Sequence, residues 1–260
     1  MRIDLYLTEH GYVQSRQRAK QLIGEGNVTV DGRVISKPSE SVDEHTTHTV
    51  AVTDTQKYVS RGGLKLEGAL QHFQIEVAGR HALDIGASTG GFTDCLLSFG
   101  ADHVTAVDAG AGQLAEKLLR DPRVTSIEHL NARSISLDDV GAPVSLIVMD
   151  VSFISATYII PRFSQLLEEG GEAVCLIKPQ FEVGRSMLGK GGIVKDPAAH
   201  RFAIEKVLQS GRDNKLTPVG LMVSPIKGGD GNREFLVHFK KGDVQACTLD
   251  PAYIRRIVGG

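Results

Sequence analysis

The spacing of apolar residues changes character once along the chain, near residue 60. Before that point, Ala19, Leu22 and Ile23 follow i, i+3, i+4 spacing behind Ser15, a residue suited to a helix N-cap. The glycines that come next predict the end of that helix. The N-terminal part of the chain is therefore expected to contain a short amphipathic helix.

A β-hairpin is predicted directly after this helix. Valines alternate with polar residues over 28–30, Asp31-Gly32 provides a turn, and apolar residues return at 34–35. One more strand is expected at 50–52. Residues 1–55 are therefore predicted to form a small α+β unit with its own core.

From residue 60 onwards, strand patterns alternate with helical ones, which is typical of a mostly parallel, doubly wound sheet. The last connection, residues 224–234, is glycine-rich and too short for a helical crossover, so the final strand is expected to run antiparallel. The predicted fold class is α/β, a Rossmann-like methyltransferase sheet of seven strands with the last one reversed. The expected strands are 81–85, 104–107, 124–128, 144–149, 173–177, 216–223 and 235–239.

Composition indicates a globular chain without a membrane partner. Hydrophobic residues make up 41% and charged residues 23% of the 260 positions, and the net charge of −2 gives no bulk attraction to nucleic acid. No apolar run approaches the ~18 residues of a spanning helix, and Asp4 and Glu9 argue against a signal peptide. Because Cys95, Cys175 and Cys247 form no CxxC pair, we expect free thiols, a cytoplasmic protein and no metal site.

The segment from Asp84 to Gly91 reads DIGASTGG and joins the first strand of this sheet to its helix. Asp108 ends the second strand, where a carboxylate can bind ribose hydroxyls. The loop lacks the GxGxxG dinucleotide fingerprint, and the chain has no GxxxxGK[ST] stretch. Asp84 would repel a pyrophosphate but could accept hydrogen bonds from an ammonium group, so the loop favours S-adenosylmethionine over a dinucleotide.

Four ionisable residues are predicted to meet at one edge of the sheet. Asp150 ends the fourth strand, Lys178 ends the fifth, and Glu234 opens the reversed seventh. Ligands bind beyond the carboxyl ends of parallel strands, and a reversed strand begins at that same edge. Lys65, beside the apolar stripe of the preceding helix, could reach the same crevice. A lysine emerging into solvent remains the alternative for Lys178 taken alone.

The N-terminal pattern resembles a known family. The segment SRQRAKQLIGEGNVTVDGRVI is similar to the small αL-type RNA-binding domain found in a small-subunit ribosomal protein, in pseudouridine synthases and in tyrosyl-tRNA synthetases. The resemblance implies that Arg16, Arg18 and Lys20 face RNA. Composition alone leaves a solvated charged face as the alternative.

The second part resembles the FtsJ-type ribose 2′-O-methyltransferases, whose Lys-Asp-Lys-Glu tetrad matches Lys65, Asp150, Lys178 and Glu234 in order. The whole chain is similar to the TlyA or haemolysin A group through SRGGLKL, DIGASTGGFTD, MDVSFIS, IKPQFE and GNREF. The resemblance implies domains at 1–55 (RNA-binding) and 62–245 (methyltransferase), a linker at 56–61 and a tail at 246–260. The implied S-adenosylmethionine-binding residues are Asp84, Gly86, Ser88, Thr89, Gly90, Gly91, Phe92, Asp108 and Asn131.

These residue types suit deprotonation of a ribose hydroxyl. A lysine titrates near 10.4 and becomes a base at neutral pH only where burial and a neighbouring cation lower its pKa. The expected roles are Lys178 as general base, Lys65 as the neighbouring cation that positions the 2′-oxygen, Asp150 orienting Lys178, and Glu234 holding Lys65 or the ribose.

The resemblance implies a ribosomal RNA or ribosomal subunit as partner, with cytidine as the usual target. The start at MRIDLYL resembles the shorter members and favours the large subunit. Two alternatives are a non-enzymatic RNA-binding factor and a cytolysin, although nothing amphipathic supports the latter. Tyr58 departs from relatives that carry Trp, and the oligomeric state is left open.

Overall fold

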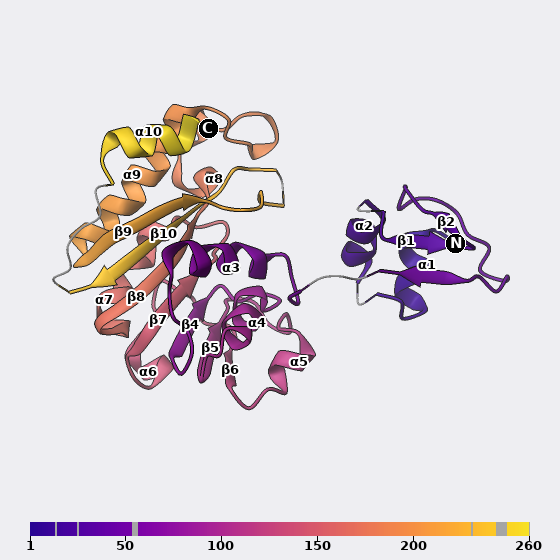
Figure 1. Cartoon of the computed structure of the whole chain (residues 1–260), viewed down its shortest axis with the longest axis horizontal. Helices are drawn as coiled ribbons and strands as arrows, with labels where there is room; N and C mark the ends of the chain where they lie inside the picture. The colour runs from indigo at the N-terminus through magenta and orange to yellow at the C-terminus, as the bar shows by residue number, and fades with distance from the viewer. Residues whose placement is uncertain (14, 25, 54–56, 230, 243–248, 260) are drawn as a thin grey trace. The chain divides into compact units, whose positions relative to one another are not determined.

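The computed structural model describes residues 1–13, 15–24, 26–53, 57–229, 231–242 and 249–259. The chain divides into two compact units, Met1–Gln56 and Lys57–Gly260, each with its own hydrophobic core (Figure 1). Cys247 lies outside the described residues. The same holds for residue 56 of the expected linker and for residues 246–248 and 260 of the expected tail.

The N-terminal unit contains two helices and a three-stranded sheet of order β2-β1-β3. Its core joins buried residues of both helices, among them Leu7 and Leu22, to Val28 of the first strand. The elements are α1 (Ile3–Glu9), α2 (Arg16–Gly24), β1 (Val28–Val30), β2 (Arg33–Val34) and β3 (Val50–Val52).

Local signals in the sequence account for two of these elements. The hydroxyl of Ser15 accepts a hydrogen bond from the backbone N–H of Arg18 at 3.2 Å, which confirms the predicted N-cap of α2. Asp31 and Gly32 have φ angles of 51° and 77°, the left-handed pair that a two-residue hairpin turn of type I′ requires. The predicted hairpin is therefore confirmed, with β1 and β2 antiparallel.

The second unit is built on a seven-stranded sheet of order β6-β5-β4-β7-β8-β10-β9. The pairs β4–β5, β4–β7, β5–β6 and β7–β8 are parallel, whereas β10 is antiparallel to both of its neighbours. The predicted reversal of the last strand is confirmed. The strands are β4 (His81–Ile85), β5 (His103–Val107), β6 (Val124–Ile127), β7 (Val144–Met149), β8 (Leu167–Ile177), β9 (Leu216–Val223) and β10 (Phe235–Lys241).

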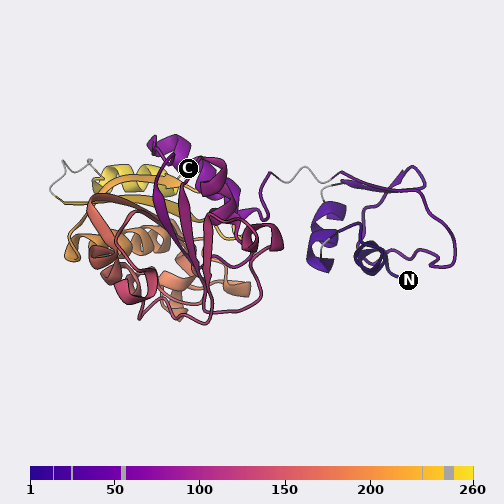
Figure 2. The same cartoon turned by 90° about the horizontal axis from the view of Figure 1, so that it is seen from below.

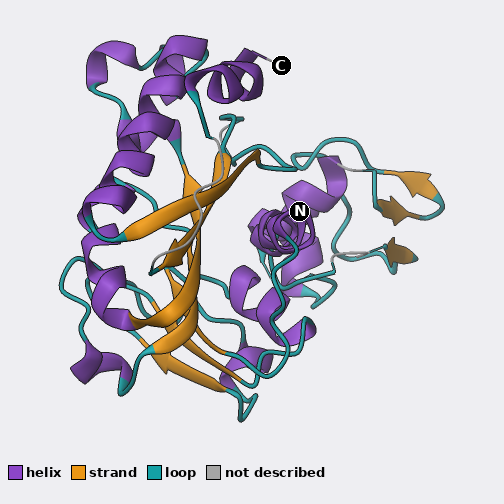
Figure 3. Ribbon diagram, turned by 60° about the vertical axis from the view of Figure 1, so that its left-hand side comes forward, coloured by secondary structure: helices purple, strands orange, loops and turns teal. Residues whose placement is uncertain are grey.

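Helices cover both faces of this sheet, as Figures 2 and 3 show. One core cluster joins the sheet to α3 (Gly62–Phe73), α4 (Gly91–Ser98) and α5 (Glu116–Leu119). The cluster on the other face includes residues of α7 (Ile160–Leu166), α9 (Pro197–Asp213) and α10 (Pro251–Gly259), and α6 (Leu137–Val140) packs against it. Short elements complete this face: η1 (Ala156–Tyr158), α8 (Pro179–Glu182), η2 (Arg185–Met187) and η3 (Lys190–Gly192).

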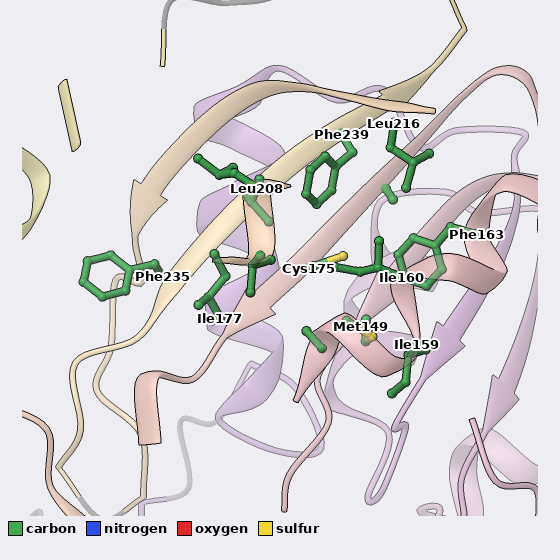
Figure 4. Packing of buried hydrophobic residues seen from close by; sticks show 14 of the residues in the cluster. Met149, Ile159, Ile160, Phe163, Cys175, Ile177, Leu208, Leu216, Phe235 and Phe239 are labelled. Carbon is green, nitrogen blue, oxygen red and sulfur yellow. The ribbon is translucent and has the colours of Figure 1, made fainter. Parts of the chain in front are cut away.

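The larger core is dominated by aromatic and branched side chains, and Figure 4 shows part of it. Phe163 of α7, Leu208 of α9 and Phe239 of β10 are at most 1% exposed. Cys175 of β8 and Cys95 of α4 are buried free thiols, and burial raises the pKa of the Cys95 thiol to about 12. These two cysteines serve as small apolar packing residues.

Three segments differ from the sequence-based expectation. Strand β8 begins at Leu167, well before the predicted start at 173. Leu167 pairs with Val144 of β7, and the pairing resumes at Glu172 after a register shift. The polar residues between them carry no strand pattern, so the sequence did not indicate this early start. Part of the expected tail forms α10, whose Ile254 is 3% exposed in the larger core. Tyr58, in the expected linker, is 2% exposed and packs within the second unit.

Candidate active site

The predicted catalytic residues come together at the carboxyl edge of the sheet. Asp150 follows β7, Lys178 follows β8, and Glu234 precedes the reversed β10. Lys65 enters from the first turn of α3. The side chains of all four residues are at most 19% exposed. Strand polarity therefore places groups that are far apart in the sequence within one small volume.

An alternating chain of charges links the four side chains. The Lys178 ammonium lies 2.5 Å from one oxygen of Asp150, and the Lys65 ammonium lies 3.8 Å from the other. Lys65 also lies 2.7 Å from the carboxylate of Glu234. Asp150 thus stands between two lysines, and Glu234 neutralises the one on its far side.

Lys178 has a further partner that the sequence did not indicate. Its ammonium donates a hydrogen bond to the hydroxyl of Ser152 at 2.7 Å, so Asp150 and Ser152 together fix its position. Glu234 is the most buried member of the tetrad, and burial raises the pKa of its carboxyl despite the attraction of Lys65. A neutral Gly228 faces this carboxylate, and a Cβ at that position would lie 2.4 Å from it.

The glycine loop after β4 approaches the tetrad closely. Gly86 has a φ of 85°, and a Cβ there would lie 2.5 Å from the backbone oxygen of Asp150. Gly90 has a φ of 94° as the N-cap of α4, and a Cβ there would collide with Leu118. Both positions require glycine, for backbone conformation and for space.

Asp84 is completely buried beneath this loop. One of its oxygens accepts a hydrogen bond from the hydroxyl of Thr93 at 2.6 Å, and the other has no hydrogen-bond partner among the described residues. Burial raises the pKa of its carboxyl to about 7. A buried carboxylate with an unused acceptor fits a cationic group, as expected for the ammonium of S-adenosylmethionine.

A pocket of about 490 Å³ lies beside the loop, which is within the usual size range of a small-molecule site. Of the predicted cofactor residues, Gly86, Ser88, Asp108 and Asn131 line it. Asp108 accepts hydrogen bonds from the backbone N–H groups of Ser88 at 2.8 Å and Gly110 at 2.7 Å. The carboxylate is thereby held at the pocket wall.

The remaining predicted cofactor residues lie elsewhere. Asp84, Gly90, Gly91 and Phe92 are buried, Thr89 is exposed, and none of them lines the pocket. The Phe92 ring is 3% exposed and belongs to the core on the α3–α4 side. An aromatic residue in an apolar helical stripe is compatible with a core position and with a ligand contact, so the sequence could not distinguish these two roles for Phe92.

Several lining residues were missed by sequence reasoning. Gln113 lines the pocket and accepts a hydrogen bond from the hydroxyl of Ser88 at 3.0 Å. Its segment of the sequence has no helical or strand periodicity that would have indicated a site. The segment after Asp150, residues 151–154, forms much of another wall. The signature MDVSFIS could have drawn attention to this segment. The side-chain oxygen of Asn131 accepts a hydrogen bond from the backbone N–H of Arg133 at 3.0 Å, as in an Asx turn.

The three predicted RNA-binding residues of the N-terminal unit differ in exposure and in partners. Arg16 is exposed and donates to the buried carboxylate of Asp4 at 3.0 Å, and Arg2 donates to the same group at 2.9 Å. This pairing lowers the pKa of Asp4 to about 2. Lys20 is exposed and lies one helical turn after Arg16, so these two residues share a face of α2. Arg18 is half-buried and lies between them in the sequence, off that face.

Comparison with known proteins agrees with this geometry. The family model for FtsJ-like methyltransferases matches residues 58–241, and that for the S4 domain matches residues 1–47. The 16S/23S rRNA (cytidine-2′-O)-methyltransferase TlyA of Mycobacterium tuberculosis is 43% identical over the whole of this chain and 98% of its own length. This chain belongs to the TlyA family of FtsJ-like methyltransferases.

Other TlyA relatives support this assignment. The 23S rRNA (cytidine-2′-O)-methyltransferase TlyA of Campylobacter jejuni is 30% identical over 93% of this chain and its own full length. A solved structure from Streptococcus thermophilus is 40% identical, with a TM-score of 0.80 over this whole chain and 94% of that one. The protein is an S-adenosylmethionine-dependent methyltransferase with an N-terminal S4 domain. No helix among the described residues is long and apolar enough to cross a membrane.

Proposed function

We propose that this enzyme methylates the 2′-hydroxyl of a cytidine in ribosomal RNA, with large-subunit RNA as its principal substrate. The observation that carries the proposal is the Lys178–Asp150–Lys65–Glu234 chain of charges beside the cofactor pocket. The names of the M. tuberculosis and C. jejuni relatives both include 23S rRNA and cytidine, whereas only the former includes 16S rRNA. A ribosomal RNA substrate implies a cytoplasmic enzyme.

S-adenosylmethionine supplies, when bound, a methyl group activated by its sulfonium. Asp108 and Asn131 line the pocket from the side of β5 and β6 and are assigned to the ribose and adenine. Asp84 is assigned to the ammonium through the carboxylate oxygen that has no hydrogen-bond partner among the described residues. Gly86 and Ser88 line the pocket, and with Thr89, Gly90, Gly91 and Phe92 they belong to the loop and helix start that shape it.

The tetrad is assigned to the nucleophile. Lys178, as the neutral amine, takes the proton of the 2′-hydroxyl as general base and becomes the ammonium, and Asp150 and Ser152 hold its nitrogen in place. Lys65 provides the neighbouring positive charge and positions the 2′-oxygen. Glu234 orients Lys65 through their 2.7 Å contact. Much of the acceleration then comes from holding the hydroxyl in line with the methyl group.

RNA delivery is assigned to the S4 domain. Arg16, Arg18 and Lys20 on α2 are the proposed phosphate contacts. Asp4 restrains the guanidinium of Arg16 and so reduces the entropy that it loses on binding. Because phosphate contacts release counterions, the affinity for RNA should fall steeply with salt.

The test is transfer of labelled methyl from S-adenosylmethionine to purified, unmethylated ribosomal subunits of each size, with Lys178→Ala alongside. General-base catalysis typically contributes about 10²–10⁴-fold, so the variant should lose nearly all turnover. Its affinity for S-adenosylhomocysteine should match that of the unaltered enzyme, because Lys178 does not line the pocket. Normal turnover in the variant would refute the role of Lys178, and no label in either subunit would refute the substrate.

A further inference from the structure

A second hollow adjoins the cofactor pocket and has no role in the assignments above. It has a volume of about 790 Å³ and shares Asn131, Phe153 and Ile154 with the cofactor pocket. Its other walls come from η1, α8, η2 and α9. We call it the aromatic groove. A molecule that lies in it would continue directly to the pocket where methyl transfer is expected.

Exposed aromatic rings of the second unit gather in this groove. Among its described residues, the phenylalanines and tyrosines with more than a third of their surface exposed are Phe153 at 92%, Tyr158 at 59% and Phe202 at 45%. All three line the aromatic groove, and half-buried Phe181 lies 5.3 Å from Phe153 between ring centroids. Rings left in water beside an active site provide stacking faces for planar groups.

Tyr158 is supported by one contact to its ring and by one bond at the start of its helix. The guanidinium of Arg133 lies 5.1 Å from the centroid of the Tyr158 ring. The backbone oxygen of Arg133 accepts a hydrogen bond from the side chain of Arg162 at 2.8 Å, which restrains the backbone of Arg133. Helix η1, which carries Tyr158, starts at Ala156, whose backbone N–H donates to Glu182 at 2.7 Å. A ring on such a support loses little entropy when a ligand stacks on it.

The floor of the groove is a built polar cluster. Glu182 is 4% exposed and accepts from the hydroxyl of Ser155 at 2.5 Å and from Lys206 at 3.2 Å. Among the described residues that line the groove, Glu182 is the one acidic residue, and Lys206 neutralises it. Arg133 and Arg185 add two positive charges to the lining. The groove therefore suits a ligand that combines flat rings with negative charge.

We infer that the aromatic groove binds unpaired RNA nucleotides next to the methylated one, with bases stacked on Tyr158 and Phe202 and phosphates near Arg133 and Arg185. This inference rests on the proposed function, because it takes RNA as the substrate. An unpaired strand is required, since bases within a duplex do not expose their faces. The groove would thus determine which neighbouring nucleotides must be unstacked for the target ribose to reach Lys178.

The test is binding of a labelled single-stranded fragment of unmethylated large-subunit RNA, followed by fluorescence anisotropy. Base stacking on one ring is worth about 1–3 kcal/mol, so Tyr158→Ala and Phe202→Ala should each weaken RNA binding by about 5- to 150-fold. Tyr158→Phe keeps the ring and should bind RNA like the unaltered enzyme. Affinity for S-adenosylhomocysteine, by calorimetry, and kcat at saturating RNA should be unchanged in all three variants, whereas KM for RNA should rise in the two alanine variants.

Leu119→Ala is the matched control, because Leu119 is also a large exposed apolar residue, at 51%, but lies on α5 outside the groove. Unchanged RNA affinity in both alanine variants would refute the groove while leaving the proposed function intact. An unaltered enzyme that neither binds nor methylates the RNA would refute both. A defect seen with intact ribosomal subunits and absent with naked RNA would mean that the groove docks a protein, and would overturn the inference.

Discussion

Replacing Asp84 by asparagine should stabilise the protein, and the gain should grow with pH. The carboxyl of Asp84 is completely buried, and burial raises its pKa from 3.8 to about 7. A gap of about three pH units corresponds to at most about 4 kcal/mol at ~1.4 kcal/mol per unit. This is the free energy that folding loses by burying the ionised group.

The sign follows from proton binding. Between about pH 4 and pH 7 the folded state holds the Asp84 proton and the unfolded state does not, so this group makes stability fall as pH rises through that window. Asparagine has no charge to bury and can still accept from Thr93. The stability difference between Asp84→Asn and the unaltered protein should therefore grow by about 2.5 kcal/mol from pH 5 to pH 8.

The assay is urea denaturation of both proteins without cofactor, followed by circular dichroism at several pH values. Using the difference between the two proteins cancels the titration of every other group. A difference that stays constant across this range would show that Asp84 titrates normally, and the burial argument would fail. The same variant should bind S-adenosylmethionine more weakly at pH 8, because an amide lacks the charge that pairs with an ammonium.

Three further predictions concern Gly86 in the loop after β4, Glu172 in β8 and Asn232 in the loop before β10. Gly86→Ala should cost about 1–3 kcal/mol and weaken cofactor binding in calorimetry, because alanine is strained at a φ of 85° and its Cβ meets Asp150. Glu172→Gln should cost about 3 kcal/mol at neutral pH, with cofactor affinity unchanged, because it removes the negative charge that faces Arg80 at 2.6 Å and Lys240 at 2.9 Å. Because its partners hold the pKa of Glu172 well below its usual range, that cost should shrink as pH falls below about 4.5, as denaturation at acid pH would show. The side chain of Asn232 is 1% exposed and makes two hydrogen bonds, to the backbone of residues 192 and 194. Asn232→Ala removes both, so proteolysis of the loop that contains residues 192 and 194 should accelerate while the melting temperature falls only slightly.

Much of the fold was determined locally and was therefore readable from the sequence. The N-cap at Ser15 and the turn at Asp31-Gly32 depend on residues within a few positions of each other. The short glycine-rich link before Glu234 left no room for a crossover helix, and this fixed the direction of β10. Strand ends then located Asp150 and Lys178 at one edge, because parallel strands share a polarity.

Other features depended on contacts that no local pattern encodes. The early start of β8 at Leu167 is fixed by pairing with β7, since its polar residues have no strand period. Phe92 lies in the core rather than the pocket because α4 turns that face towards α3. The aromatic groove joins Tyr158 to Phe202 across separate helices, and only packing decides which rings remain exposed. The sequence by itself determined the elements, their direction and the candidate chemistry, whereas tertiary structure decided which side chains face each other, because that depends on register and packing between distant segments.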